Sequence, residues 1–141
     1  MNACDLMSRD VMTLSPLTDV CAAARLLTER RITGAPVVDQ ERNILGVVSL
    51  SDLARLQGGE RPDGWVGAGA DWPEPGEPVP VLALMTPRAI TCDERTPIEE
   101  VARIMLERRI HRLLVTRDGK LTGIITAMDV LRAVAAQRAG H

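Results

Sequence analysis

The feature that most constrains the fold of this chain is an internal duplication. The stretch GVVSLSDL at residues 46–53 recurs as GIITAMDV at residues 123–130, with a glycine, two β-branched residues, a hydroxyl and an aspartate in the same register. Upstream, Met7 aligns with Met85 at an offset of 78, and the offset falls to 77 at the repeated stretch. A turn between two strands absorbs a one-residue difference easily. The chain is therefore expected to contain two copies of one structural unit.

Each copy begins with the same two elements. A short extended piece, VMTLS or AITCD, precedes a helix whose apolar residues recur every three or four positions, at residues 18–30 in the first copy and 96–108 in the second. In the second copy, Thr96 predicts an N-cap, Pro97 a first helical residue and Glu99 the partner of a capping box. The start of each copy therefore predicts a strand followed by an amphipathic helix.

Each copy continues with two β-rich runs and a closing helix. The runs are APVVD and ILGVVSL in the first copy, and RLLVT and LTGIITA in the second, where Asp118-Gly119 predicts a tight hairpin turn. The closing helices are expected at residues 52 to about 56 and 129 to about 137. The predicted unit is β-α-β-β-α. Because a half-core of about 55 residues is marginal alone, we expect an α+β fold in which the two repeats, related by a pseudo-twofold axis, pack as one compact module.

A long irregular segment joins the copies. We place the first repeat at residues 1–56, the linker at 57–80 and the second repeat at 81–141. The linker holds six Gly, five Pro and both tryptophans, Trp65 and Trp72, a composition typical of a loop. Two interpretations remain open: the tryptophans pin a tether to the surface, or the linker is a lid that places an indole over a bound ring.

The composition excludes several classes of function. With a formal net charge of -2, no Phe and no Tyr, the chain lacks both the basic field and the stacking rings that nucleic-acid binding uses. No apolar run approaches the roughly 20 residues of a membrane span. Cys4, Cys21 and Cys92 form neither a CxxC pair nor an even set, which favours a reducing compartment. We expect a soluble, cytoplasmic protein that binds neither nucleic acid nor membrane.

The repeated motif has a chemistry of its own. In each copy a predicted strand ends and a helix begins there, so backbone N–H groups without helical partners lie beside the hydroxyl and favour an anion such as phosphate. An aspartate at the helix start can accept two hydrogen bonds from the vicinal hydroxyls of a ribose. Ser49 with Asp52, and Thr126 with Asp129, thus match the sugar-phosphate part of a nucleotide. The alternative is that these four residues only cap helices, where Ser, Thr and Asp are common.

The order and spacing of these elements carry a resemblance to a known family. Each copy has LMS or LMT near its start, GAPVVD or HRLLVT in its middle, and glycine-x-x-hydroxyl-x-x-aspartate near its end. Together the copies resemble a tandem pair of cystathionine β-synthase (CBS) domains, the Bateman module, over the whole chain apart from the linker and the last few residues. The resemblance implies a stand-alone regulatory module that binds an adenosine-containing ligand, AMP, ADP, ATP or S-adenosylmethionine, in clefts between the repeats and passes the signal to a partner.

The resemblance also implies roles for particular residues. The aspartates would take the ribose hydroxyls, the motif hydroxyls would lie near the phosphates, and an apolar slot bounded by the first and middle strands would hold the base. His111-Arg112 resembles a His-Arg pair that touches phosphate in the family, whereas the first copy has Thr33-Gly34 there, so one well-formed site and one weaker site are expected. The implied ligand-binding residues are Thr13, Pro36, Val37, Ser49, Asp52, Thr91, His111, Arg112, Leu114, Val115, Thr126 and Asp129.

The sequence indicates no catalytic machinery. It contains no recognisable metal cluster and no nucleophile with a base, and its two histidines are His111 and His141. We therefore expect no enzyme, no catalytic residue, no metal and no required cofactor. The expected partners are a second copy of the chain, since such modules commonly form a homodimer through their helices, and an unidentified effector protein. The alternative is a ligand-free CBS-type dimerisation or interaction module.

Overall fold

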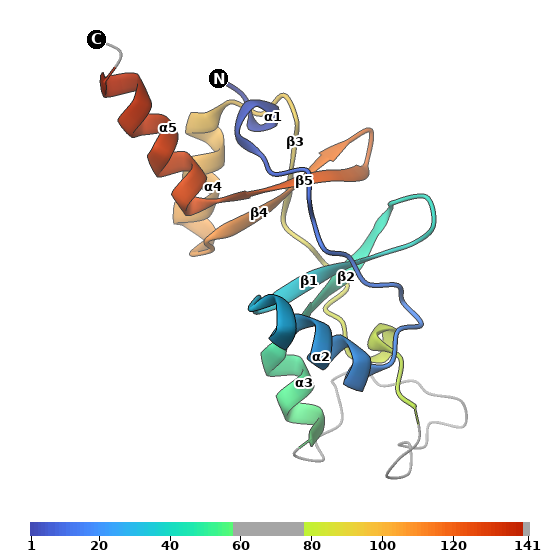
Figure 1. Ribbon diagram of the computed structural model, residues 1–141. Helices are drawn as coiled ribbons and strands as arrows, with labels where there is room; N and C mark the ends of the chain where they lie inside the picture. Colours follow the sequence, from blue (N-terminus) through green and yellow to red (C-terminus); the bar gives the residue numbers. More distant parts are fainter. Residues whose placement is uncertain (58–77, 140–141) are drawn as a thin grey trace. The chain divides into compact units, whose positions relative to one another are not determined.

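A computed structural model of the protein describes residues 1–57 and 78–139 (Figure 1). Most of the predicted linker, including Trp65 and Trp72, lies outside the described residues, as does His141. The two interpretations of the linker therefore both stay predictions.

The chain divides into two compact units. Unit 1 consists of Met1–Val11 together with Ile90–His141, and unit 2 consists of Met12–Ala89. Each unit therefore combines the first residues of one sequence repeat with the remainder of the other repeat.

Unit 1 is built on a three-stranded sheet. Its elements are α1 (Ala3–Leu6), β3 (Thr91–Asp93), α4 (Ile98–Arg108), β4 (Arg112–Arg117), β5 (Lys120–Thr126) and α5 (Ala127–Ala139). The strand order is β3-β4-β5, with β3 parallel to β4 and β4 antiparallel to β5. Asp118 and Gly119 join β4 to β5 with positive φ angles of 52° and 79°, as in a type I′ turn. The hairpin predicted from the sequence is confirmed.

Unit 2 is built on an antiparallel pair of strands. Its elements are α2 (Val20–Arg30), β1 (Gly34–Val38), β2 (Ile44–Ser49), α3 (Leu50–Gln57) and a short 3₁₀ helix, η2 (Val81–Ala83). β1 pairs with β2 through a turn at residues 39–43. The Asp39 carboxylate organises this turn by accepting the backbone N–H groups of Glu41 and Asn43 at 2.8 and 2.9 Å. The change of offset between the copies falls in this turn, which is longer than its counterpart in unit 1.

The expected first strand of the first copy is reduced to a single bridge. VMTLS contributes only the parallel pairing of Leu14 with Val37, in which the Leu14 N–H donates to the Pro36 carbonyl at 2.9 Å. The next ladder bonds on either side would need N–H groups from Pro36 and Pro16, which have none. In the second copy Glu94 replaces the second proline, and its N–H donates to Thr116 at 2.9 Å. The extended piece predicted at the start of each copy therefore forms a strand in the second copy and a single bridge in the first.

Two predictions about helix starts are also wrong. α4 begins at Ile98 after Pro97, and the Thr96 hydroxyl accepts the Asp93 N–H at 3.1 Å instead of capping the helix. The expected capping box with Glu99 does not form, because that hydroxyl closes the turn after β3. The closing helices α3 and α5 begin two residues before the motif aspartates at which the sequence places them.

The glycine of the first motif lies under a crossing segment of the chain. Val47 and Thr86 exchange two backbone hydrogen bonds of 2.9 and 2.8 Å, so residues 85–86 run directly over β2. A Cβ added at Gly46 would collide with the Thr86 carbonyl oxygen and would lie 3.0 Å from the Met85 sulfur. Only glycine allows this close approach.

The glycine of the second motif lies under the equivalent crossing segment. Ser8 and Ile124 exchange two backbone hydrogen bonds of 2.9 Å. A Cβ at Gly123 would lie 2.5 Å from the Met7 sulfur and 2.9 Å from the Ser8 carbonyl oxygen. The repeated glycine is thus explained by the start of one repeat crossing the strand of the other.

The hydrophobic core of each unit draws on both sequence repeats. In unit 2, Val79 and Val81 belong to the same buried cluster as Leu27, although the sequence places Val79 in the linker. In unit 1, Ala3 belongs to the same cluster as Ile125. Within the described ranges, no helix combines the length and apolar character that a bilayer crossing requires.

Candidate ligand-binding site

The second motif forms a reciprocal cap at the start of α5. The Thr126 N–H donates to Oδ2 of Asp129 at 2.8 Å, and the Asp129 N–H donates to the Thr126 hydroxyl at 3.2 Å. These two bonds make a capping box in which aspartate holds the place usually taken by glutamate. The motif therefore fixes the junction between β5 and α5.

The first motif forms the same cap at the start of α3. The Ser49 N–H and hydroxyl both donate to Oδ2 of Asp52, at 3.0 and 2.9 Å, and the Asp52 N–H donates to the Ser49 hydroxyl at 3.2 Å. Capping is thus one role of both residue pairs, as the alternative interpretation of the motif predicts. The cap uses one oxygen of each carboxylate, and a carboxylate has about four acceptor positions. Capping and ligand binding are therefore compatible.

In unit 1 the segment His111-Arg112 lies beside the capping box. Arg112 is the register partner of Thr126 across the β4-β5 pair, and such facing residues have Cβ atoms about 5 Å apart. The carbonyl of His111 accepts the N–H of Ala127, the first residue of α5, at 2.8 Å. His111 and Arg112 are both exposed. The structure therefore brings together four residues that the sequence predicts for one site: His111, Arg112, Thr126 and Asp129.

In unit 2 the equivalent strand positions are uncharged. Gly34 is the register partner of Ser49, and the carbonyl of Thr33 accepts the Leu50 N–H at 2.8 Å. A Cβ at Gly34 would lie 3.0 Å from the Val48 carbonyl oxygen, so the position offers little room for a larger residue. The two motifs therefore have the same backbone arrangement and differ in the charge of the neighbouring strand.

Most of the residues that the resemblance assigns to a base slot are buried. Four of them have buried side chains: Pro36, Val37, Leu114 and Val115. Val37 and Val115 are 0% exposed, so a ligand could meet only their backbone groups. Thr13 is half-buried and Thr91 is exposed, which leaves their hydroxyls accessible. Thr13 also lines a pocket of about 440 Å³ in unit 2, beside the turn that follows β1.

Arg132 is a neighbour of the motif aspartate that the motif itself does not include. Its Nη1 lies 3.4 Å from Oδ1 of Asp129, the carboxylate oxygen that the cap does not use. The signal was present, because an arginine follows each motif aspartate by three residues, at Arg55 and at Arg132. On a helix, that spacing puts two side chains on the same face.

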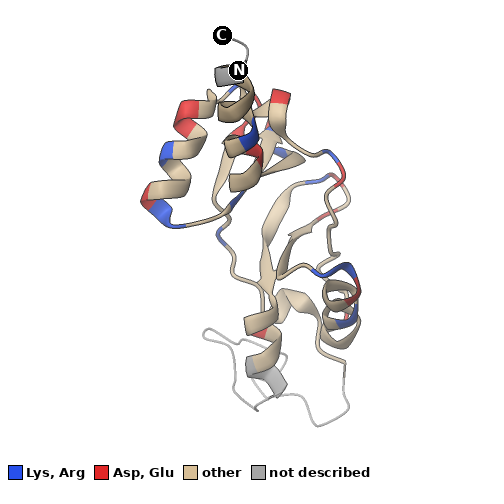
Figure 2. Ribbon diagram, turned by 60° about the vertical axis from the view of Figure 1, so that its left-hand side comes forward, with Lys and Arg blue, Asp and Glu red and all other residues tan. Residues whose placement is uncertain are grey.

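Other exposed charges of unit 1 are paired along α4, where acidic and basic residues alternate (Figure 2). Arg103 bonds to Glu100 on the preceding turn and to Glu107 on the following turn, the latter at 2.7 Å. The hydrogen bond from Arg103 lowers the pKa of the Glu100 carboxyl. Exposed pairs of this kind contribute little to stability.

The described residues show no metal-binding group of three or more His, Cys, Asp or Glu side chains. Cys4, Cys21 and Cys92 are free thiols. Burial raises the pKa of Cys92 to about 11, with the Thr96 side chain opposing the shift and Asp93 adding to it. Cys92 is therefore a protonated, unreactive thiol at neutral pH.

A family model for the CBS domain matches the chain twice, at residues 3–59 and 81–136. The chain therefore belongs to the CBS domain family and contains a tandem pair of CBS domains. The α+β fold class and the two repeats predicted from the sequence are confirmed.

Similar proteins extend this assignment. The CBS domain-containing protein CBSX1, chloroplastic, of Arabidopsis thaliana is 37% identical over 139 residues, which cover 88% of this chain and 59% of that protein. The crystal structure of CBSX2 in complex with AMP has a TM-score of 0.75 and 32% identity, and the match covers 97% of this chain and 98% of that chain. The CBS domain pair of protein MJ0100, in complex with 5′-methylthioadenosine and S-adenosyl-L-methionine, shares the fold at a TM-score of 0.71 and 22% identity, with coverage of 97% and 98%.

Proposed function

We propose that the chain is a regulatory module that binds an adenosine-containing compound, AMP, ADP, ATP or S-adenosylmethionine, and passes the signal to a partner. The observation that carries the proposal is the meeting of Arg112, Thr126 and Asp129 at one end of the β4-β5 pair. A guanidinium and a hydroxyl suit a phosphate, and a carboxylate suits the vicinal hydroxyls of a ribose. The likeness to AMP-bound CBSX2 supports adenosine as the nucleoside.

The capping box shapes the experiment that tests this proposal. Truncating Asp129 to alanine would remove the cap and a ligand contact together, so loss of binding would be ambiguous. Asp129→Asn keeps a carbonyl oxygen to accept the Thr126 N–H and removes the charge that the ribose hydroxyls need. We expect isothermal titration calorimetry to show saturable binding of at least one adenosine compound, and about tenfold weaker binding in Asp129→Asn.

The controls separate the two roles of the aspartate. Thermal unfolding without ligand should give nearly the same midpoint for Asp129→Asn and the wild-type protein, because the cap is retained. Absence of saturable binding to AMP, ADP, ATP and S-adenosylmethionine, in a folded and ligand-free protein, would contradict the proposal. That result would favour a CBS-type interaction module in which the motifs only cap helices.

We propose further that the two motifs bind unequally. The unit 1 motif has His111 and Arg112 beside it, whereas the unit 2 motif has Thr33 and Gly34. A phosphate gains charge-assisted hydrogen bonds from the neighbouring strand only at the unit 1 motif. Calorimetry should therefore give one tight and one weaker binding event per chain, and two equal events would contradict this part of the proposal.

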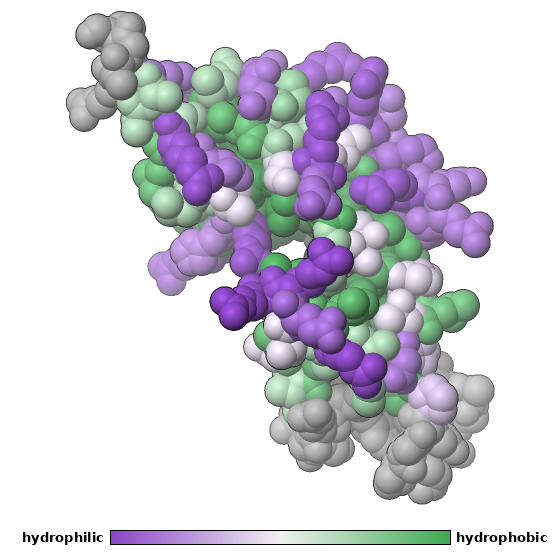
Figure 3. Space-filling model, in the orientation of Figure 1, coloured by the Kyte–Doolittle hydropathy of each residue, from purple (hydrophilic) through white to green (hydrophobic). Residues whose placement is uncertain are grey.

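Self-association is a second proposed role, and the exposed hydrophobic residues of α4 and α5 support it. Hydrophobic residues reach the surface along α5 (Figure 3), where Met128, Leu131 and Val134 are 56%, 60% and 49% exposed. Leu106 on α4 is 80% exposed. An isologous dimer needs one self-complementary patch on both subunits. We propose that a second copy covers this α4-α5 face.

The first copy provides a matched control for the dimer. The positions equivalent to Leu106, Met128 and Leu131 are Thr28, Ser51 and Ala54, so the unit 2 helices lack the patch. A charge introduced by Leu131→Glu should turn a dimer into a monomer in sedimentation velocity experiments, whereas Ala54→Glu should leave the dimer intact. A monomeric wild-type protein, or equal effects of the two variants, would contradict a dimer through α4 and α5.

We also propose a non-catalytic protein of a reducing compartment, the cytoplasm. The free thiols suit such a compartment, and the protonated Cys92 offers no nucleophile. A relative, CBSX1, is named as chloroplastic, so cell fractionation should compare the two compartments where both exist.

A further inference from the structure

Arg132 contacts the motif aspartate and has no role in the function proposed so far. Its side chain is 73% exposed, whereas that of Asp129 is 21% exposed. Its Nη1 lies 3.4 Å from Oδ1 of Asp129, and the other oxygen, Oδ2, accepts the Thr126 N–H at 2.8 Å. One oxygen of this carboxylate is thus held by the backbone, and the other faces a long, solvent-exposed cation.

A ribose that binds Asp129 approaches the carboxylate oxygen that Arg132 contacts. Two vicinal hydroxyls donate to a carboxylate most favourably when each oxygen accepts one of them, and Oδ1 is the oxygen that Arg132 contacts. The ion pair between Arg132 and Asp129 is exposed and its contact is long. Breaking it therefore lowers the affinity for a ribose by no more than about fivefold. Binding a ribose is therefore expected to displace the guanidinium rather than to be prevented by it.

The displaced guanidinium remains close to the bound ligand. Arg132 follows Asp129 by one helical turn on α5, so its head can move only within the reach of its side chain. A planar guanidinium with several donors fits two oxygens of a phosphate at once. An uncharged group at the same place on the ligand offers it nothing comparable.

We propose that Arg132 is a specificity-determining residue that favours phosphorylated adenosine compounds over unphosphorylated ones. Without ligand it neutralises Asp129, and with ligand it exchanges the carboxylate for a phosphate. The inference rests on the proposed adenosine site. The sequence places an arginine at the equivalent position of the first copy, Arg55, so the same spacing from the aspartate occurs twice.

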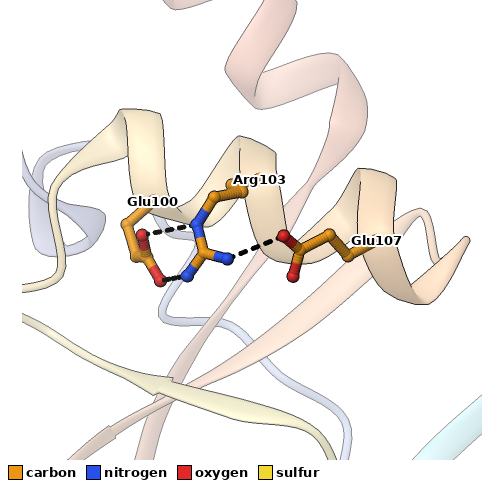
Figure 4. Close-up of polar contacts among 3 residues, drawn as sticks. All are labelled: Glu100, Arg103 and Glu107. Atoms are coloured by element: carbon orange, nitrogen blue, oxygen red, sulfur yellow. Dashed lines mark hydrogen bonds and ion pairs between the residues drawn. The ribbon is translucent and has the colours of Figure 1, made fainter.

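A matched control is available on the neighbouring helix. Arg103 also has a carboxylate three residues before it, Glu100, and the two side chains lie next to each other along α4 (Figure 4). Glu107 accepts a hydrogen bond from Nη1 of Arg103 at 2.7 Å. Arg103 thus has the same type of helical ion pair without a motif aspartate, and Arg103→Gln reports what loss of such a pair does by itself.

The test is calorimetric titration of the full chain with adenosine and with AMP. Arg132→Gln should bind adenosine about twofold to threefold more tightly than the wild type, because the competitor for Asp129 is gone. The same variant should bind AMP about tenfold more weakly, because a charge-assisted bond is lost. Arg132→Lys should recover part of the AMP affinity, and Arg103→Gln should leave the affinity for both ligands unchanged.

The possible outcomes separate this inference from the function on which it rests. A wild type that binds both ligands, with an Arg132→Gln variant that changes neither or weakens both equally, overturns the role of Arg132 and leaves the adenosine site standing. A wild type that binds neither adenosine nor AMP overturns both. A shift of the two affinities in opposite directions supports the inference, because a purely structural role would move them together.

Discussion

The two motifs are alike where they hold the fold together and different where they face the solvent. In both units a glycine admits a crossing segment, and a hydroxyl and an aspartate cap the closing helix. The neighbouring strand then brings Arg112 to the unit 1 motif and Gly34 to the unit 2 motif. The equal parts have structural causes that are present in both copies. The unequal parts are therefore the better indicators of ligand binding.

The largest expected effect tests the shared glycines. We predict that Gly46→Ala destabilises the protein by about 3 kcal/mol and Gly123→Ala by about 1–2 kcal/mol. At Gly46 the atom nearest the new Cβ is the Thr86 carbonyl oxygen, which accepts the Val47 N–H. At Gly123 the nearest atoms belong to the flexible Met7 side chain, and the Ser8 carbonyl oxygen is farther away at 2.9 Å. Urea unfolding followed by circular dichroism measures both values.

Gly119→Asn is the control for this pair. Gly119 has a positive φ, and a Cβ added there would have no other atom within 4 Å, so asparagine should cost much less at this position. Unchanged stability of Gly46→Ala would show that the crossing segment is not held against β2 as the two hydrogen bonds to Val47 require.

The next effect tests the difference in charge beside the two motifs. We predict that Arg112→Gln weakens AMP binding by about tenfold, because a guanidinium bonded to phosphate is replaced by a neutral amide. Thr33→His should strengthen the weaker binding event by a few-fold at a pH where histidine is protonated. Arg117→Gln, at the opposite end of β4, is the control and should have no effect. Equal calorimetric losses of AMP affinity in Arg112→Gln and Arg117→Gln would mean that the effect comes from the net charge of the protein and not from the position of Arg112.

A smaller effect tests the shared caps. We predict that Asp52→Ala and Asp129→Ala each lower the free energy of unfolding by about 1 kcal/mol without ligand, as the loss of a capping contact does. The two losses should be similar because the bonds to Oδ2 are similar in length. Ser51→Ala, an exposed residue of α3, is the control. A loss at only one of the two aspartates would contradict the equivalence of the caps.

The order of elements could be predicted from the sequence because it depends on local patterns. The helices α2 and α4 follow their apolar spacing, and the turn at Asp118-Gly119 follows from residues that accept positive φ. The exchange of the starting segments could not be predicted, because Met7 and Gly123 meet across more than a hundred residues of sequence. Short-range patterns contain no information about such a contact.

The residue types of the candidate site could be read from the sequence, whereas their geometry could not. The sequence predicted the hairpin at Asp118-Gly119, and the structure adds the register in which Arg112 faces Thr126. The capping bonds depend on where α5 begins, and the helix starts two residues earlier than the aspartate suggested. Helix boundaries are less well determined by sequence than helix existence.

The smallest effect concerns one core position at which the copies differ in chemistry. Leu14 and Cys92 occupy equivalent places and are 2% and 6% exposed. Burial raises the pKa of Cys92 from its ordinary 9.0 to about 11, so the folded protein favours the neutral thiol. The resulting stabilisation is complete below about pH 9 and is lost progressively as the pH rises towards about 11, because the unfolded chain ionises first.

Cys92→Val removes this titration and keeps a buried apolar side chain. We predict that the melting temperature of the wild type falls more steeply with pH than that of Cys92→Val over this range, and that the two agree in slope near neutral pH. Cys21→Val is the control, since Cys21 is exposed and should leave the slope unchanged. Parallel pH profiles for the wild type and Cys92→Val would mean that the thiol reaches water in the folded state. Cys92 would then differ from Leu14 in packing as well as in chemistry.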